Sequence, residues 1–143
     1  MTGSYYTRLD IERAIALCQN LCPSGFRDAM PRPDDTPLTD ETIVRQVNAC
    51  ARFIAHMCAP TKTICRLVSS YGWKHIAENV LGQHVCNGAF IAAAILAGYR
   101  VARDTPRSPN AVFNMRVSSA TLRAYIDGGQ VGRFSRVWEP YNT

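Results

Sequence analysis

The stretch from Ser69 to Gly98, SSYGWKHIAENVLGQHVCNGAFIAAAILAG, constrains the fold of this chain more than any other. Its first part has apolar residues at helical spacing after a capping serine, Ser69 or Ser70. This part ends at Gly82, because glycine readily adopts the left-handed backbone conformation that terminates many helices. Residues 88–98 are apolar on every side. A helix without a polar face is buried, and about eleven residues are too few to cross a bilayer. The sequence therefore predicts two helices joined by a tight turn, the second being the central core helix.

Apolar spacing and capping residues predict further helices on both sides of this pair. They span residues 8–21, residues 39–58, residues 109–115, and a segment that begins after Ser118 or Ser119. Residues 61–68, TKTICRLV, contain β-branched side chains, but no second strand pattern lies nearby, so we expect an extended connector. Residues 26–38 form a loop rich in proline and aspartate, and residues 1–7 and 132–143 are expected to be loose tails. The predicted fold is all-α: one compact domain, residues 1–143, with about five or six helices.

Composition limits the class of protein. At 143 residues, with 47% apolar and 19% charged residues, the chain can bury a core of its own and is not typical of disordered proteins. No charged-then-apolar leader follows Met1, and no apolar run approaches the length of a membrane span. We therefore expect a cytoplasmic protein with no membrane association. The six cysteines lie mostly among apolar helix positions, which favours reduced thiols packed in the core.

Charge is unevenly distributed along the chain. Residues 1–60 carry six arginines against seven acidic residues, a net charge of −1, whereas residues 61–143 carry ten basic residues against four acidic ones, a net charge of +6. Such asymmetry suggests a basic face directed at nucleic acid or an acidic partner, although an arginine-rich solvated surface has the same composition. The candidate binding residues are Lys62, Arg66, Lys74, His75, Arg100, Arg103 and Arg107. They would contact phosphates rather than bases, so binding would be sensitive to salt.

Two familiar binding motifs fit poorly. A DNA-reading helix-turn-helix needs polar and basic side chains on its second helix, whereas residues 89–97 are apolar. A zinc site could draw on Cys18 with Cys22, four apart on a predicted helix, or on pairs at the ends of helices. These pairs are His84 with Cys86 and His56 with Cys58. Helical thiols at this spacing are commonly core residues, so no metal is assigned. Trp73, Tyr99 and Phe113 could stack on bases, but aromatic residues are more often core or rim.

An enzyme that uses a cysteine nucleophile is the alternative to a binding protein. Cys86 lies near a predicted helix start, where the dipole could depress its pKa, and His75 or His84 could act as a base. No third orienting residue and no oxyanion-hole motif is visible, so Cys86 is equally well a small side chain at a helix cap. The chain also lacks a phosphate-binding glycine loop and paired carboxylates. We therefore assign no catalytic residue and no cofactor.

Part of the central stretch resembles a block found in small uncharacterised proteins of bacterial phages, plasmids and prophages. The block reads Ser70-Tyr71-Gly72-Trp73-Lys74-His75 with Glu78, then Asn87-Gly88-Ala89-Phe90-Ile91-Ala92-Ala93-Ala94 and Gly98-Tyr99, and covers roughly thirty of the 143 residues. The resemblance implies no activity. It implies a context in which short single-domain proteins, anti-CRISPR inhibitors among them, bind a host machine. Lys74 and His75 are polar members of the block and are a candidate functional pair; alternatively, Lys74 is solvated and His75 bonds the neighbouring turn.

Together these observations predict a non-enzymatic binding protein of a mobile element. Its basic C-terminal half would engage nucleic acid or a host nucleoprotein complex, as an anti-CRISPR inhibitor does. The alternatives are a small Cys/His-dependent enzyme centred on Cys86 and a structural module that forms homo-oligomers.

Overall fold

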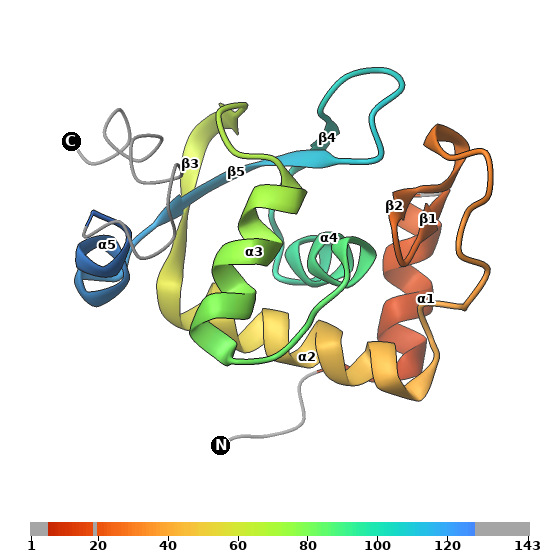
Figure 1. Ribbon diagram of the computed structural model, residues 1–143, viewed down its shortest axis with the longest axis horizontal. Coiled ribbons are helices and arrows are strands. Elements are labelled where there is room, and N and C mark those ends of the chain that lie inside the picture. The colour runs from red at the N-terminus through yellow and green to blue at the C-terminus, as the bar shows by residue number, and fades with distance from the viewer. Residues whose placement is uncertain (1–5, 19, 128–143) are drawn as a thin grey trace.

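The computed structural model describes residues 6–18 and 20–127, and it contains two small sheets among its helices (Figure 1). The α-helices are α1 (Arg8–Leu17), α2 (Glu41–Met57), α3 (Ser70–Leu81), α4 (Asn87–Leu96) and α5 (Ala120–Asp127). A short antiparallel hairpin, β1 (Leu21–Cys22) and β2 (Gly25–Phe26), leads into a 3-10 turn, η1 (Arg27–Ala29). The second sheet is antiparallel with the strand order β3 (Cys58–Cys65), β5 (Ala111–Val117), β4 (Val101–Arg103).

The prediction of an all-α fold is therefore wrong: the protein is mixed α/β. Strand β5 lies where a helix was predicted over residues 109–115, and β3 includes most of the segment expected to be a connector. Six of the seven residues of β5 are buried, so the strand lacks the alternation of apolar and polar residues that marks a half-exposed strand. Its register pairs Cys58 with Val117, and partners so far apart in sequence leave no local hairpin signal.

Three predicted helices are confirmed. Helix α2 begins at Glu41, close to the predicted start at residue 39, because the N-cap is Asp40, whose carboxylate accepts a hydrogen bond of 3.1 Å from the Thr42 N–H. Helix α3 follows Ser69 and ends at Gly82, which has the left-handed φ of 69° expected at that position. Helix α4 spans Asn87–Leu96, so it begins one residue earlier and ends two residues earlier than the predicted range of 88–98. A fourth, α5, follows Ser119, whose hydroxyl accepts a hydrogen bond of 3.1 Å from the Leu122 N–H.

The N-terminal prediction is corrected in two respects. Helix α1 ends at Leu17 rather than near residue 21. Tyr6 and Thr7 are not loose: the Tyr6 hydroxyl donates to the Leu96 carbonyl over 3.1 Å, and the Thr7 side chain caps α1. Residues 1–5 and the predicted tail 132–143 lie outside the described residues.

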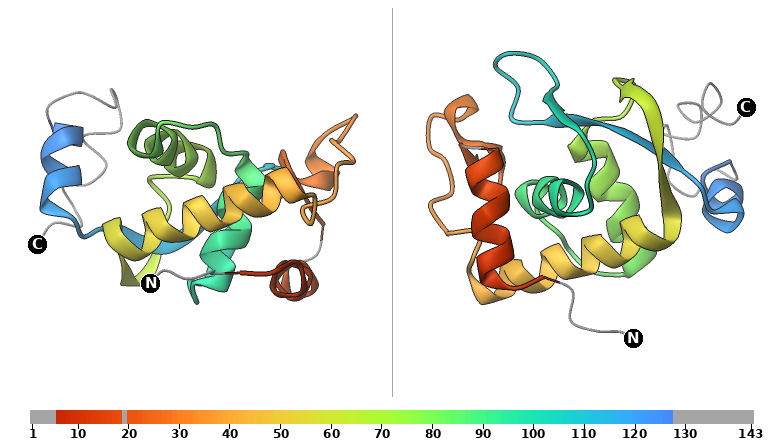
Figure 2. Two further views of the ribbon diagram at one scale, coloured as in Figure 1. Left: turned by 90° about the horizontal axis from the view of Figure 1, so that it is seen from below. Right: turned by 180° about the vertical axis from the view of Figure 1, so that it is seen from behind.

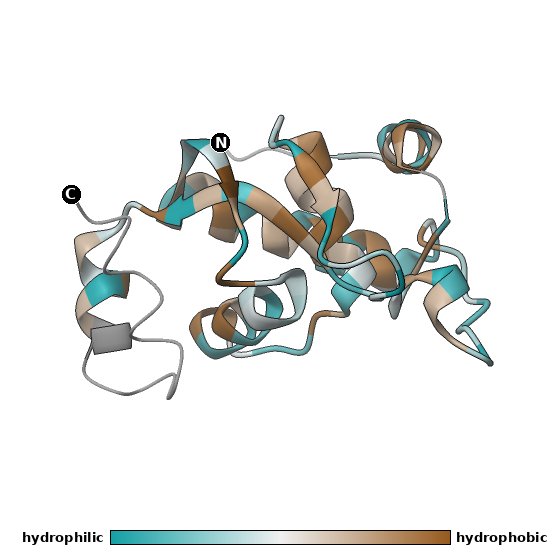
Figure 3. Cartoon of the chain, turned by 90° about the horizontal axis from the view of Figure 1, so that it is seen from above, coloured by the Kyte–Doolittle hydropathy of each residue, from teal (hydrophilic) through white to brown (hydrophobic). Residues whose placement is uncertain are grey.

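Helix α4 lies at the centre of the molecule, with α2 beneath it and α1 and α3 on either side (Figures 1 and 2). Residues 89–94 have no exposed surface, which confirms the predicted core helix. Phe90 stacks on Trp73 of α3 with ring centroids 6.2 Å apart and meets Phe113 of β5 at 5.8 Å. Trp73 and Phe113 are completely buried, so they are core residues and cannot stack on bases. Figure 3 shows long hydrophobic runs along these central elements.

The edge strand β3 contains a bulge that shapes one end of the sheet. Its pairing with β5 shifts between Pro60, opposite Met115, and Cys65, opposite Phe113, so residues 61–64 loop away from the ladder. The buried Asn114 stabilises this irregularity, because its Nδ2 donates to the Thr61 carbonyl over 3.2 Å while its Oδ1 accepts from the Arg100 N–H at 2.7 Å. The Asn114 amide thus connects the central strand to β3 and to the residue that precedes β4.

Among the described residues, none of the helices combines the length and apolarity needed to cross a membrane. All six cysteines lie in the described part and none is paired in a disulfide. Four of them, Cys22, Cys50, Cys58 and Cys65, are buried.

Candidate functional site

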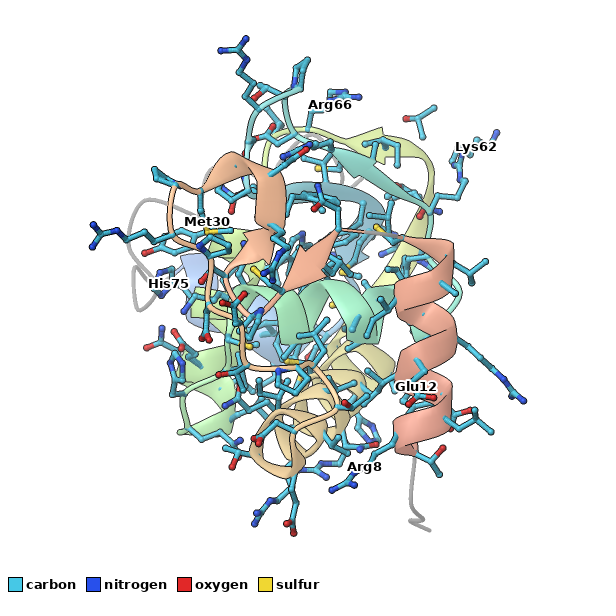
Figure 4. The ribbon with its side chains drawn as sticks, turned by 90° about the vertical axis from the view of Figure 1, so that its right-hand side faces the viewer. Arg8, Glu12, Met30, Lys62, Arg66 and His75 are labelled. Carbon is cyan, nitrogen blue, oxygen red and sulfur yellow. The ribbon has the colours of Figure 1, made fainter. Side chains whose placement is uncertain are left out.

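Four of the seven predicted binding residues lie at the bulged end of the β3–β5–β4 sheet. We call this set, Lys62, Arg66, Arg100 and Arg107, the basic edge. All four are exposed. The Arg100 guanidinium donates to the Lys62 carbonyl, and the Arg66 guanidinium donates to the Asp104 carbonyl over 3.2 Å. These contacts connect β3 and the residue after it with the residues that flank β4, and Figure 4 shows Lys62 and Arg66 projecting from the same end of the molecule.

Arg103, also predicted to bind, is instead paired with a carboxylate of the protein itself. Its guanidinium forms a two-pronged ion pair with Asp28 of η1 and lies over the Phe26 ring, 4.7 Å from the centroid. Its Nε donates to the Ser108 carbonyl over 2.8 Å. The Asp28 carboxylate raises the pKa of Arg103, and Arg103 in turn lowers the pKa of Asp28. The role of Arg103 is to fasten β4 to the β1–β2 hairpin.

Lys74 and His75 lie on α3, away from the basic edge, and both contact Glu78. Helical spacing accounts for this, because residues three and four apart share a face. Lys74 Nζ is 3.2 Å from Glu78 Oε2, and His75 Nδ1 is 3.1 Å from Glu78 Oε1. After Gly82 the chain turns back, so His84 Nδ1 lies 2.8 Å from Glu78 Oε2 and the Val85 N–H donates to it over 3.1 Å. We call Lys74, His75, Glu78 and His84 the Glu78 cluster.

The Glu78 cluster is partly desolvated. The Lys74 side chain is 10% exposed and that of Glu78 is 19% exposed, so a solvated Lys74 is excluded. Burial raises the pKa of Glu78, but the Val85 N–H and the Lys74 ammonium outweigh burial and leave this pKa below its usual value of 4.5. Glu78 is therefore ionised at neutral pH, and it joins α3 to the turn that precedes α4.

A cleft of about 520 Å³ opens beside this cluster; we call it the polar cleft. The phage-like block contributes Tyr71, Lys74 and Asn87, and the turn between its two parts contributes His84 and Cys86. The opposing segments, which precede α2 and β5, contribute Pro23, Ser24, Asp34, Pro109 and Asn110. The volume is within the range of small-molecule sites, about 300–1,000 Å³.

Asn87 and Gly88 set the shape of the polar cleft. Asn87 Nδ2 donates to Asn110 Oδ1 over 2.9 Å and to the Ser24 carbonyl over 3.1 Å. The Gly88 N–H donates to the Pro23 carbonyl over 2.9 Å, and a Cβ on Gly88 would lie only 2.0 Å from the Cys22 carbonyl oxygen. Only glycine allows this approach of α4 to the hairpin. The start of α4 is therefore a junction of three segments.

Cys86 does not have the properties of an activated nucleophile. Burial raises the pKa of its thiol, and this outweighs the backbone N–H of Ala89, which favours the thiolate. The expectation of a depressed pKa is wrong, because the thiol is desolvated more than the helix start stabilises it. Cys86 serves as a cap, and its own N–H donates to Gln46 Oε1 over 2.8 Å.

The zinc alternative finds no support in the described residues. Cys18 is the C-cap of α1 and Cys22 is in β1, so they do not share a helical face. In the part of the chain that the structure describes, no three histidine, cysteine or carboxylate side chains are arranged to hold a metal ion. His75 and His84 instead direct their Nδ1 atoms at separate oxygens of Glu78.

Sequence reasoning missed part of the polar cleft. Tyr71 and Asn87 were named only as members of the phage-like block, whereas Asp34 and Asn110 received no role. The block of residues 70–94 was the available signal for Tyr71 and Asn87, because it contains both. Nothing local could have indicated that Asp34 and Asn110 meet them.

Comparisons with protein-family models, with curated proteins and with solved structures found no match to this chain.

Proposed function

We propose that this chain is a non-enzymatic binding protein of a mobile element, acting in the cytoplasm. Through its basic edge it engages nucleic acid, either bare or within a host nucleoprotein complex such as a CRISPR effector. One observation carries the proposal: four exposed cations, from positions up to 45 residues apart, gather at one end of a small sheet. Gathered cations of this kind neutralise phosphates and release counterions.

Backbone contacts hold the basic edge in place before any partner binds. Arg100 and Arg66 each donate to a carbonyl of a neighbouring segment, and Asn114 fixes the bulge that carries Lys62. An arginine has five N–H donors, so one such contact leaves donors for phosphate. Pre-ordered side chains lose less entropy on binding. The described aromatic residues near this edge are buried or half-buried, which favours backbone contacts over base stacking.

Charge reversal tests the proposal. The variant carrying Lys62→Glu, Arg66→Glu and Arg100→Glu should lose at least about tenfold in affinity for short labelled DNA and RNA strands, measured by fluorescence anisotropy at several salt concentrations. The matched control carries Arg8→Glu, Arg13→Glu and Arg45→Glu, the same change in net charge on exposed residues of α1 and α2. Figure 4 shows Arg8 at the end of the molecule opposite Arg66. The control should bind nearly as well as the parent protein.

Equal losses in both variants would mean that only net charge matters, and no binding by the parent would exclude bare nucleic acid. A pull-down from bacterial lysate, with and without nuclease, then tests the nucleoprotein form of the proposal. A defined complex that survives nuclease and is lost with the basic-edge variant supports it. Sedimentation of the same samples tests the homo-oligomer alternative.

A further inference from the structure

The polar cleft lies apart from the basic edge, and the function proposed above does not use it. Both charge signs line its walls: Lys74 comes from α3, and Asp34 comes from the loop between η1 and α2. The apolar rings of Pro23 and Pro109 and the half-exposed Tyr71 complete much of the lining. A concave site in which polar groups converge beside apolar rings is typical of a small-molecule site.

Lys74 supplies the cationic side of the cleft. As a whole residue it is only 8% exposed, which is rare for lysine. Its ammonium is 3.2 Å from Glu78 Oε2 and 5.4 Å from the Tyr71 ring centroid. An ammonium has three donors, so the contact with Glu78 leaves capacity for a ligand anion. Attraction to that anion is strengthened because Lys74 is largely removed from water.

Two oxygen acceptors of the cleft, the Asp34 carboxylate and Asn87 Oδ1, are short of partners within the protein. The backbone N–H of Thr36 bonds Asp34 and lowers its pKa, so the carboxylate is ionised at neutral pH. Within residues 6–18 and 20–127, no basic side chain lies within ion-pair distance of Asp34. The Asn87 side chain, in a residue 5% exposed, leaves its Oδ1 without a hydrogen-bond partner in this part of the chain. Buried polar atoms normally find partners.

We propose that the polar cleft binds a small zwitterion of the amino-acid class, with its carboxylate at Lys74 and its ammonium at Asp34 and Asn87. A simple anion would leave the acceptors of Asp34 and Asn87 unmatched. A simple amine would place its charge near Lys74 without compensation. A zwitterion satisfies both sides, and a free amino acid fits within about 520 Å³.

The test measures thermal stabilisation and calorimetric binding of the intact chain with each of the standard free amino acids. The best of them is then compared with its N-acetyl form, which lacks the ammonium, and with its amide form, which lacks the carboxylate. The proposal expects binding by at least one amino acid and a large loss with either blocked form. Equal binding of the N-acetyl form would show an anion site, and equal binding of the amide form an amine site; either result, or no binding by any amino acid, overturns the proposal.

Variants locate the site. Asp34→Asn removes an exposed charge, so the fold should survive, and affinity should fall about five- to tenfold. The matched control is Asp35→Asn, because the neighbouring Asp35 pairs with Arg27 and does not line the cleft. Lys74→Met, checked by circular dichroism, should abolish the preference for the free carboxylate. Amino-acid binding unchanged by Asp34→Asn would overturn the assignment. The basic-edge variant should keep amino-acid binding, so this proposal and the proposed function fail independently.

Discussion

Two groups of cations in the basic half of the chain have opposite environments. Lys74 and Arg103, the inward group, are mostly shielded from solvent, and each pairs with a carboxylate. Lys74 pairs with Glu78 on its own helix, whereas Arg103 joins β4 to Asp28 of η1. Lys62, Arg66, Arg100 and Arg107 are exposed at one end of the sheet. A net charge of +6 over residues 61–143 therefore overstates the surface available to a polyanion. The inward group should matter for stability and the outward group for binding, and the following predictions test this division.

The largest effect is expected from Glu78→Ala. This variant leaves the ammonium of Lys74 buried without its carboxylate and removes the contacts that hold the turn before α4. Loss of one partner of a buried ion pair predicts a destabilisation of about 3 kcal/mol, measured by urea unfolding. The control is Glu41→Ala, because Glu41 forms the same i,i+4 pair with Arg45 where both side chains are exposed; it should cost less than about 0.5 kcal/mol. Equal destabilisation by Glu78→Ala and Glu41→Ala would contradict the greater importance of the buried pair for stability.

Arg103→Ala should destabilise the protein by about 1 kcal/mol. It removes the ion pair with Asp28 and the contact with the Phe26 ring, both of which are partly exposed at the hairpin. Nucleic-acid affinity, measured on the folded variant, should change less than with Arg100→Ala. A larger loss of affinity from Arg103→Ala would place Arg103 back among the binding residues.

The pH dependence of stability should distinguish Glu78 from exposed carboxylates. The pKa of Glu78 is lowered in the folded protein. The ionised carboxylate therefore contributes its full stabilisation at pH values above its unfolded pKa of about 4.5, and this contribution is lost as the pH falls through the lower pKa of the folded state. Glu78→Gln should therefore show a shallower decline of unfolding free energy from about pH 5 to about pH 3 than the parent. A parallel decline in both proteins would contradict the lowered pKa.

The smallest effect on stability is expected from Lys62→Ala or Arg107→Ala, each within about 0.5 kcal/mol. Each should nevertheless reduce the slope of log affinity against log salt by about 1, because one phosphate contact is lost. Anisotropy titrations over a range of salt concentrations measure this slope. An unchanged slope for both variants would show that these exposed side chains do not contact phosphate, which would contradict the assignment of the basic edge as the nucleic-acid site.

The contrast between helices and strands explains what sequence reasoning could reach. Helices α2, α3 and α4 were predicted because apolar spacing, caps and Gly82 all act within a few residues. Strands β3 and β5 were missed because β5 is buried on nearly its whole length and its partner lies about fifty residues earlier. The same limit applies to the sites. Lys74 and His75 were named from a local block, whereas tertiary packing brings Asp34, Asn87 and Asn110 to the walls of one cleft.

The bulge in β3 has a consequence for self-association. An edge strand with unpaired backbone groups can recruit a strand of another molecule and start aggregation. Strand β3 contains Pro60, which lacks a backbone N–H donor. Residues 61–64 follow, which are displaced from the ladder and include the charged Lys62. The opposite edge, β4, is only three residues long. The sheet is thus poorly suited to growth from either side, so the segment that presents the basic edge also protects the chain from stacking into fibres.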